Sequence, residues 1–334
     1  MERKNREKFS KRTGPLDLGS RSDFCFVAQS FQKNQSIGPL LRCADAGMAR
    51  EVIILGRKGW KKRGAVGGTY CVPYRHIHNP RDAISYLRDS DMSIVAVEKN
   101  DRSTSLFHCA YPPKPAFVFG DETYGVYQSL FDAADLAVAI PMYGTIQSLN
   151  VSISAAIVMY DYLQKRNRDL QIKAVDVPID LDLRSDFCLV AQSFQKEHNI
   201  DTVLRYANAG MAREVVAVGR RDWYERGAVN DAYGVPYKHI RHPNDAIDYL
   251  RSNGMSIVVI EKNESSKNLF DCVYPSKSAF VLGNEVYGVY PAFLDAADLV
   301  VEIPMYGALR SLNVSVTGAV VMYDYLQKRD KRDN

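Results

Sequence analysis

The chain repeats itself, and this repeat limits what it can fold into. At an offset of 163 residues, positions 21–166 match positions 184–329 without a gap, and 92 of these 146 positions are identical. Solenoid proteins instead repeat units of about 20–50 residues. A unit of 146 residues is long enough to form a domain. We therefore expect a first unit at 21–166 and a second unit at 184–329, with a linker at 167–183 and tails at 1–20 and 330–334.

The composition fits two ordinary globular domains. Hydrophobic residues make up 46% of the chain and charged residues 25%, and a net charge of +4 does not by itself require a nucleic-acid partner. The six cysteines show no CxxC or Cys/His spacing, so we expect reduced thiols and no metal site. No apolar run approaches the ~20 residues of a membrane helix. The first 20 residues lack the apolar segment of a secretory signal. We expect a cytoplasmic protein without membrane contact, and an organelle presequence stays open as an alternative.

Each unit alternates short apolar runs with helical patterns. Continuous apolar runs are typical of strands that are buried on both faces. Alternating strands and helices predict a parallel sheet covered by helices, an α/β fold. In the first unit we expect strands at 24–31, 51–56, 92–99, 116–120 and 136–142. We expect helices there at 39–48, 81–88, 128–134 and 150–165, although the segment around Asp132 could equally be a turn.

Two conspicuous segments follow neighbouring strands. "GDETYG" (120–125) comes after the fourth predicted strand and "PMYGTIQSLN" (141–150) after the fifth, and both recur in the second unit. Ligands of open parallel sheets bind at the carboxyl ends of strands, and glycine allows close approach to the backbone. Ser148 or Asn150 could cap the final helix. Taken singly, each segment is also explained by an ordinary turn or helix cap.

In this order and spacing the segments resemble the SPOUT superfamily, in its SpoU/TrmH branch of tRNA and rRNA ribose 2′-O-methyltransferases. The first family motif is an Asn followed six residues later by Arg, as in Asn199 and Arg205. The second is Gly-x-Glu-x-x-Gly, at 120–125 and 283–288. The third is Ile-Pro-Met followed by Ser-Leu-Asn-Val-Ser, at 140–152 and 303–315. The resemblance implies two tandem α/β-knot domains, each with a deep trefoil knot.

The resemblance also implies a cofactor, S-adenosyl-L-methionine. In the family, main-chain groups around the second and third motifs hold it, which agrees with strings rich in Gly, Ile, Pro and Met. Carried over residue by residue, the cofactor positions are Gly120, Ile140, Ser148 and Leu149 in the first unit and Gly283, Ile303, Ser311 and Leu312 in the second.

The implied reaction is attack of a ribose 2′-hydroxyl on the sulfonium methyl group. The family assigns activation of that hydroxyl to the arginine of the first motif, here Arg205 and, by position, Arg42. An arginine with a pKa above ~12 is a poor base, so we favour orientation and electrostatic stabilisation as its contribution. The residues expected to place the ribose and order the site are Asn150, Asn313, Glu122 and Glu285.

The two units depart from the family pattern in different places. Ser36 replaces the family Asn in the first unit, although Gly38 is kept, while the second unit has Asn199 but carries Asp201 in place of that glycine. Because it retains the Asn–Arg pair, the second unit is expected to be the better catalyst. The departures keep a second function open, a non-catalytic RNA-binding or ribosome-assembly factor. A base nitrogen as methyl acceptor fits the motifs less well.

The expected partner is RNA, either tRNA or rRNA. Loops 56–64 and 219–227 combine basic residues with Trp60 and Trp223, which suits phosphate contact and base stacking, although packed turns would look the same. The resemblance further implies dimers whose sites are completed across an interface. Two units on one chain can make that contact internally, so we expect a monomer with a pseudo-two-fold pairing of its units through their C-terminal helices.

Overall fold

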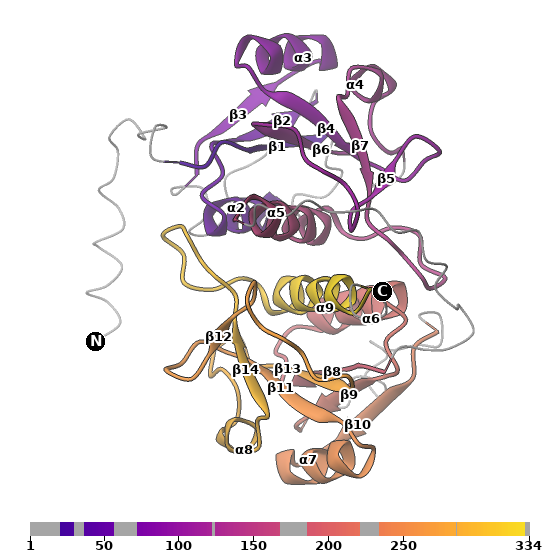
Figure 1. Ribbon diagram of the computed structural model, residues 1–334, viewed down its shortest axis with the longest axis vertical. Coiled ribbons are helices and arrows are strands. Elements are labelled where there is room, and N and C mark those ends of the chain that lie inside the picture. Colours follow the sequence, from indigo (N-terminus) through magenta and orange to yellow (C-terminus); the bar gives the residue numbers. More distant parts are fainter. Residues whose placement is uncertain are drawn as a thin grey trace.

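Two α/β units are stacked along the long axis of the molecule (Figure 1). The computed structural model describes residues 21–29, 37–56, 72–121, 124–167, 186–220, 234–284 and 286–330. The N-terminal tail, almost all of the linker and both tryptophan-bearing loops lie outside these ranges. Within the described residues, no helix is long and apolar enough to cross a membrane.

The first unit is a seven-stranded sheet with the strand order β3-β2-β1-β6-β4-β7-β5, and its strands pair in parallel. Its elements in chain order are β1 (Cys25–Gln29), α2 (Ile37–Ala46), β2 (Val52–Leu55), β3 (Tyr74–Ile77), α3 (Pro80–Asp89), β4 (Ser93–Val97), β5 (Thr104–Ser105), β6 (Pro115–Phe119), α4 (Gln128–Asp132), β7 (Leu136–Ala139) and α5 (Val151–Asn167).

The second unit repeats this architecture with the order β10-β9-β8-β13-β11-β14-β12, again with parallel pairing. Its elements are β8 (Cys188–Gln192), α6 (Glu197–Ala209), β9 (Val215–Val218), β10 (Tyr237–Ile240), α7 (Pro243–Ser252), β11 (Ser256–Ile260), β12 (Lys267–Asn268), β13 (Ser278–Leu282), α8 (Pro291–Asp295), β14 (Leu299–Glu302) and α9 (Val314–Asp330).

The predicted strands and helices of the first unit are all present, with ends that differ by a few residues. Two strands were not predicted. The strand β3 reads "YRHI" and is largely exposed at the edge of the sheet, and β5 has only two residues, so neither forms an apolar run. The parallel α/β fold is therefore confirmed, whereas the trefoil knot stays a prediction.

Helices cover both faces of each sheet, and the inner helices of the two units face one another. In Figure 1, α3 and α4 lie outside the first sheet and α2 and α5 inside it, while α6 and α9 occupy the inner side of the second sheet. The chain from Val151 to Gln164 and its copy from Val314 to Gln327 are almost entirely buried. A helix that is buried all round must have protein on every side. The first unit covers one side of α5, and α9 of the second unit covers the opposite side.

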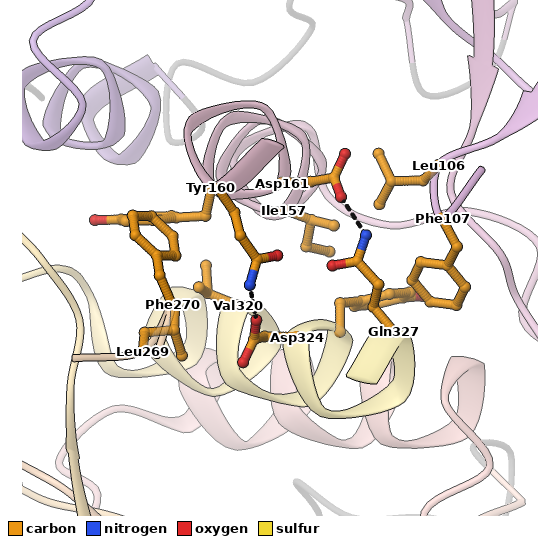
Figure 2. A pocket seen from close by; sticks show the side chains of 12 residues that line it. Leu106, Phe107, Ile157, Tyr160, Asp161, Leu269, Phe270, Val320, Asp324 and Gln327 are labelled. Atoms are coloured by element: carbon orange, nitrogen blue, oxygen red, sulfur yellow. Dashed lines mark hydrogen bonds between the residues drawn. The ribbon is translucent and has the colours of Figure 1, made fainter. Parts of the chain in front are cut away.

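Polar side chains join α5 to α9 in a symmetric pair of hydrogen bonds. Gln164 Nε2 donates to Asp324 Oδ1 at 3.0 Å, and Gln327 Nε2 donates to Asp161 Oδ1 at 2.6 Å (Figure 2). A cavity of about 20 Å³ lies between these residues, which is room for about one water molecule. None of the predicted cofactor residues lines it.

Each of these buried aspartates has further partners within its own unit. Asp161 Oδ2 accepts from the Tyr111 hydroxyl group at 2.7 Å and lies 2.8 Å from Lys165 Nζ. Burial raises the pKa of Asp161 above its ordinary value, and the Lys165 ammonium group opposes that shift. A satisfied buried network of this kind favours one relative placement of the packed helices. The equivalent group in the second unit is Asp324, Tyr274 and Lys328.

The loops that precede α5 and α9 cross to the opposite unit. We call residues 140–150 the first-unit loop and residues 303–313 the second-unit loop. Tyr143 N donates to Ala209 O at 2.7 Å, and Tyr306 N donates to Ala46 O at 2.8 Å. Each loop is thus bonded to the end of a helix in the other unit. Two tyrosine hydroxyl groups add bonds between units, from Tyr160 to Pro304 O at 2.9 Å and from Tyr323 to Pro141 O at 2.9 Å.

Glycines permit this close approach. A Cβ atom added to Gly144 would lie 2.0 Å from Asn208 O, and one added to Gly307 would lie 1.9 Å from Asp45 O. Both distances are far shorter than any real contact of a Cβ atom, and backbone cannot move aside as easily as a side chain. The two "PMYG" glycines are therefore required by contact between units.

The cysteines that the structure describes form no disulfide bonds. Cys25, Cys43, Cys109, Cys188 and Cys272 are free and buried, and Cys71 lies outside the described residues. Burial raises the pKa of the Cys109 thiol to about 11, so it is protonated at neutral pH. The expectation of reduced thiols is confirmed for these five.

We predict that Gly307→Ala lowers the free energy of unfolding by about 1–3 kcal/mol, because the added methyl group overpacks a backbone contact. Urea unfolding at 25 °C measures the change. Ala308→Val is the matched control, since residue 308 is exposed in the same loop and valine adds no hydrogen-bonding group, so it should change stability by at most about 0.5 kcal/mol. Equal midpoints for Gly307→Ala and the wild type would contradict the close packing of loop and helix.

Candidate functional site at the carboxyl edges of the sheets

Two glycine-bounded turns stand at the carboxyl edges of the sheets. After β6, Asp121 and Gly125 exchange backbone hydrogen bonds of 3.0 Å each, and Gly125 has a φ of +68°, which favours glycine. A Cβ atom on Gly120 would lie 2.2 Å from the carbonyl carbon of Gly125. The turn after β13 is built in the same way from Gly283 and Gly288. Strand β4 pairs in parallel with both β6 and β7, so the turn after β6 and the first-unit loop after β7 leave the same edge of the sheet, as predicted.

Buried glutamines, which the motif analysis missed, hold these turns in place. Gln29 Nε2 donates to Gly125 O at 2.8 Å and Gln29 Oε1 accepts from Tyr127 N at 2.7 Å. Gln192 makes the same two contacts with Gly288 O and Tyr290 N, at 3.0 Å and 2.7 Å. The available signal is a polar residue at the end of a fully apolar buried strand, "FVAQ" and "LVAQ", repeated in both units.

Asparagine caps the helix that follows each loop. Asn150 Oδ1 accepts from Ser152 N at 3.0 Å and from Ser152 Oγ at 2.8 Å, and Asn313 Oδ1 accepts from Ser315 N at 2.9 Å and from Ser315 Oγ at 2.5 Å. Of the two capping candidates in the first unit, Asn150 is therefore the one that caps. These contacts use the amide oxygen of each Asn, and the amide nitrogen of Asn313 makes a separate contact.

The predicted cofactor positions gather around these turns and loops. Ile140 is buried, whereas Leu149, Ile303 and Leu312 are half-buried and pack against the core. Ser148 and Ser311 are exposed. Glu122 and Glu285 lie outside the described residues.

This arrangement fits S-adenosyl-L-methionine. The turn at Gly120 has no room for a side chain, and the first-unit loop forms neither helix nor strand, so its main-chain N–H and C=O groups are not all used in regular structure. The half-buried Leu149 adds apolar surface for an adenosine group. Backbone donors and acceptors beside apolar side chains are what a neutral, aromatic adenine requires.

The two arginines of the first motif have different surroundings. Arg42 lies on α2 of the first unit, and its Nη2 donates to Ser311 O of the second-unit loop at 3.2 Å. Its Nε is buried without a hydrogen-bond partner. Arg205 lies on α6, and its Nε donates to Asp201 Oδ2 at 3.2 Å.

Asn199 and Arg205, the expected pair, have different partners: Arg205 pairs with Asp201, whereas Asn199 contacts Asn313 of the second-unit loop. Asn199 is fully buried, and its Oδ1 accepts from Asn313 Nδ2 at 3.3 Å, two residues from the Ser311 carbonyl group that Arg42 contacts. The arginine near Asn199 and Asn313 is thus Arg42, from the other unit. Spacing within one unit could not reveal this, because the contact spans 269 residues.

Asn208 and Asp45 are equivalent residues, and each binds the loop of the opposite unit through different hydrogen bonds. Asn208 Oδ1 accepts from Ile146 N at 2.9 Å and Asn208 Nδ2 donates to Thr145 Oγ1 at 3.1 Å. At the equivalent place, Asp45 Oδ2 accepts from Leu309 N at 2.8 Å, but Asp45 Oδ1 is buried without a partner. The residue equivalent to Thr145 is alanine, at position 308.

We predict that Asp45→Asn lowers the free energy of unfolding by about 1 kcal/mol, because it creates a buried NH₂ group without an acceptor, and that adding Ala308→Thr recovers this loss by supplying the hydroxyl acceptor of the other unit. Urea unfolding of Asp45→Asn and of the double variant measures the recovery. Equal midpoints for these two variants would show that the two loops are not held in equivalent ways.

Exposed tyrosines beside the glycine turns are further residues that sequence reasoning missed. Tyr124 is 81% exposed and Tyr287 is 84% exposed, at equivalent positions of the two turns. Large exposed aromatic side chains near a candidate site offer surfaces for stacking. The tryptophans that were expected to stack, Trp60 and Trp223, lie outside the described residues.

Known proteins resemble this chain in both of its units. The model of the SpoU rRNA Methylase family matches residues 23–160 and again residues 186–323. A tRNA (guanosine(18)-2′-O)-methyltransferase of Borreliella burgdorferi is 45% identical over 86 residues, which cover 26% of this chain and 39% of that protein. The 23S rRNA (guanosine-2′-O-)-methyltransferase RlmB of Neisseria meningitidis serogroup B is 31% identical over 156 residues, covering 45% of this chain and 62% of that protein.

The matched segments span less than two thirds of either relative. Among solved structures, the SpoU methyltransferase AviRb from Streptomyces viridochromogenes, in complex with AdoMet, is similar with 22% identity and a TM-score of 0.40. That alignment covers 46% of this chain and 66% of AviRb.

Proposed function

This chain belongs to the SpoU rRNA Methylase family in both of its units, and we propose that it is an S-adenosylmethionine-dependent RNA ribose 2′-O-methyltransferase. The observation that carries the proposal is the convergence at the second-unit loop. There, Asn199 and Asn313 meet, and the Arg42 guanidinium reaches the Ser311 carbonyl group. The names of the tRNA and rRNA methyltransferases that match the chain support RNA as the substrate class.

When bound, S-adenosylmethionine supplies an activated methyl group on a sulfonium sulfur. The chain's own residues then have three tasks. The glycine turn and the loop hold the cofactor through main-chain groups. The Asn313 amide, held by Asn199, orients the ribose. The arginine stabilises negative charge that develops on the 2′-oxygen as its proton leaves, since guanidinium donates hydrogen bonds but does not act as a base near neutral pH. The methyl group would move from sulfur to the 2′-oxygen, the hydroxyl proton would pass to solvent, and S-adenosylhomocysteine would be released.

The exposed tyrosines support an RNA substrate. Single-stranded or splayed-out nucleotides are recognised by stacking on aromatic side chains, and Tyr124 and Tyr287 present such rings next to the cofactor turns. The second-unit loop also carries the exposed Arg310, which suits contact with phosphate.

We also propose that the protein is a monomer in which the two units pair internally. The hydrogen bonds between α5 and α9 and the loops that cross between units support this pairing. A tether raises the effective concentration of the second unit to roughly the millimolar range, so pairing within a chain is favoured over pairing between chains.

We predict micromolar binding of S-adenosylmethionine at up to two sites per chain, because both units keep the glycine turn and the loop. Isothermal titration calorimetry measures the affinity and the stoichiometry. Mapping of ribose methylation in RNA from cells with and without the protein then tests the reaction. Absence of binding heat, of a thermal shift and of any change in the methylation map would reject the proposed activity.

We predict a solution mass near that of one chain, 37.6 kDa, at micromolar concentration. The inner helices are already covered by one another, which leaves no need for a second copy. Light scattering across a dilution series measures the mass. A mass of twice that value that persists on dilution would show that units pair between chains.

A further inference from the structure

We infer that the two loops serve unequal sites, and that methyl transfer takes place at the second-unit loop with Arg42 of the first unit as the arginine that meets RNA. This inference rests on the proposed function and assigns it to one of two otherwise similar sites. It also reverses the expectation from sequence that Arg205 is the principal arginine.

Each arginine lies on the helix that holds the opposite unit's loop. Arg42 precedes Asp45 on α2 by three residues, and Asp45 holds Leu309 of the second-unit loop. Arg205 precedes Asn208 on α6 by three residues, and Asn208 holds Ile146 of the first-unit loop. Residues three apart share a helix face, so each arginine is directed to the loop that its helix holds.

The guanidinium groups of Arg42 and Arg205 differ in the contact that their Nε atom makes. Arg205 Nε is used by Asp201, one turn earlier on α6. The equivalent residue in the first unit is Gly38, and Arg42 Nε has no hydrogen-bond partner. Among the described residues, no carboxylate forms an ion pair with Arg42. Arg42 therefore carries its positive charge without an ion pair, and its Nη groups, which reach the second-unit loop, can donate to a phosphate or ribose oxygen.

Asp201 and Asp45, the carboxylates near the two arginines, have different roles. The Asp201 side chain is 36% exposed and pairs with Arg205 Nε, and its negative charge repels a phosphate group that approaches Arg205. Asp45 is close to Arg42 in sequence, but it is fully buried and bonded to the backbone of Leu309. Asp45 positions the second-unit loop and forms no ion pair with the guanidinium group of Arg42.

Other side chains of the two loops also differ between the units in charge and contacts. In the second-unit loop, the exposed Arg310 adds a positive charge. Its counterpart in the first-unit loop is Gln147, whose Oε1 accepts from Lys99 at 3.0 Å. The amide of Asn313 is held by the buried Asn199. The second-unit loop thus carries an added cation and a fixed amide and contacts an arginine without an ion pair, whereas the helix that holds the first-unit loop carries an arginine that is already in an ion pair.

Single-turnover transfer of a labelled methyl group from S-adenosylmethionine to total RNA from cells lacking the protein tests the assignment, with the full chain throughout. Arg42→Ala should slow transfer by at least about 100-fold, the loss expected when a donor to developing negative charge is removed. Arg205→Ala should slow it by at most about threefold. Asp201→Asn, which frees Arg205 and keeps the side-chain shape, should leave the rate unchanged or raise it. Arg81→Ala, exposed on the outer helix α3, is the charge-matched control.

A second readout separates a role toward RNA from a structural role. If Arg42 only supported the loop through Ser311, Arg42→Ala would weaken cofactor binding; we expect calorimetry to give an affinity within about twofold of wild type while the affinity for RNA falls. Equal losses of transfer in Arg42→Ala and Arg205→Ala, or a lower rate in Asp201→Asn, would overturn the assignment.

Failure of the proposed function would look different, because the wild type itself would then transfer no methyl group. RNA affinity measured with S-adenosylhomocysteine present would still judge the inference. A larger loss in Arg42→Ala than in Arg205→Ala supports it, and equal or reversed losses overturn it.

Discussion

The packing of α5 against α9 is the constraint on which the rest of the structure depends. Each helix is buried on nearly all sides and covers its own sheet with one face, so its other face requires a partner. The buried carboxylates Asp161 and Asp324 make this requirement specific. Each accepts a hydrogen bond from a glutamine of the other unit, and this satisfied network favours one relative placement of the two helices. The duplication in the sequence supplies both partners on one chain.

This packing brings each loop onto a helix of the opposite unit. The glycines of the "PMYG" turns allow backbone to touch backbone there, at Asn208 and at Asp45. The loop that we propose to hold the cofactor in one unit is thereby placed beside the helix that carries the arginine of the other. A duplicated chain can then change one arginine's environment without altering its copy, and the Asp201–Arg205 ion pair beside the unpaired Nε of Arg42 is such a difference.

Sequence reasoning predicted the features that depend on local pattern. Continuous apolar runs predicted the buried strands, and the short polar edge strands β3 and β5 were missed because they have no such runs. The motifs were placed at the correct sheet edge, and Asn150 was among the predicted caps. The contact of Arg42 with Ser311 was not predicted, because spacing within a repeat does not reveal which copy of a loop a helix meets.

The central claim is that the loops are bonded across the two units, and amide hydrogen exchange resolved by residue tests it most directly. The N–H groups of Tyr143, Ile146, Tyr306 and Leu309 lie in loops without helix or strand, yet each donates to the opposite unit. The account predicts that they exchange about as slowly as amides in α5 and α9, since opening them requires the units to separate. Exchange at the rate of an exposed loop at all four positions would contradict it.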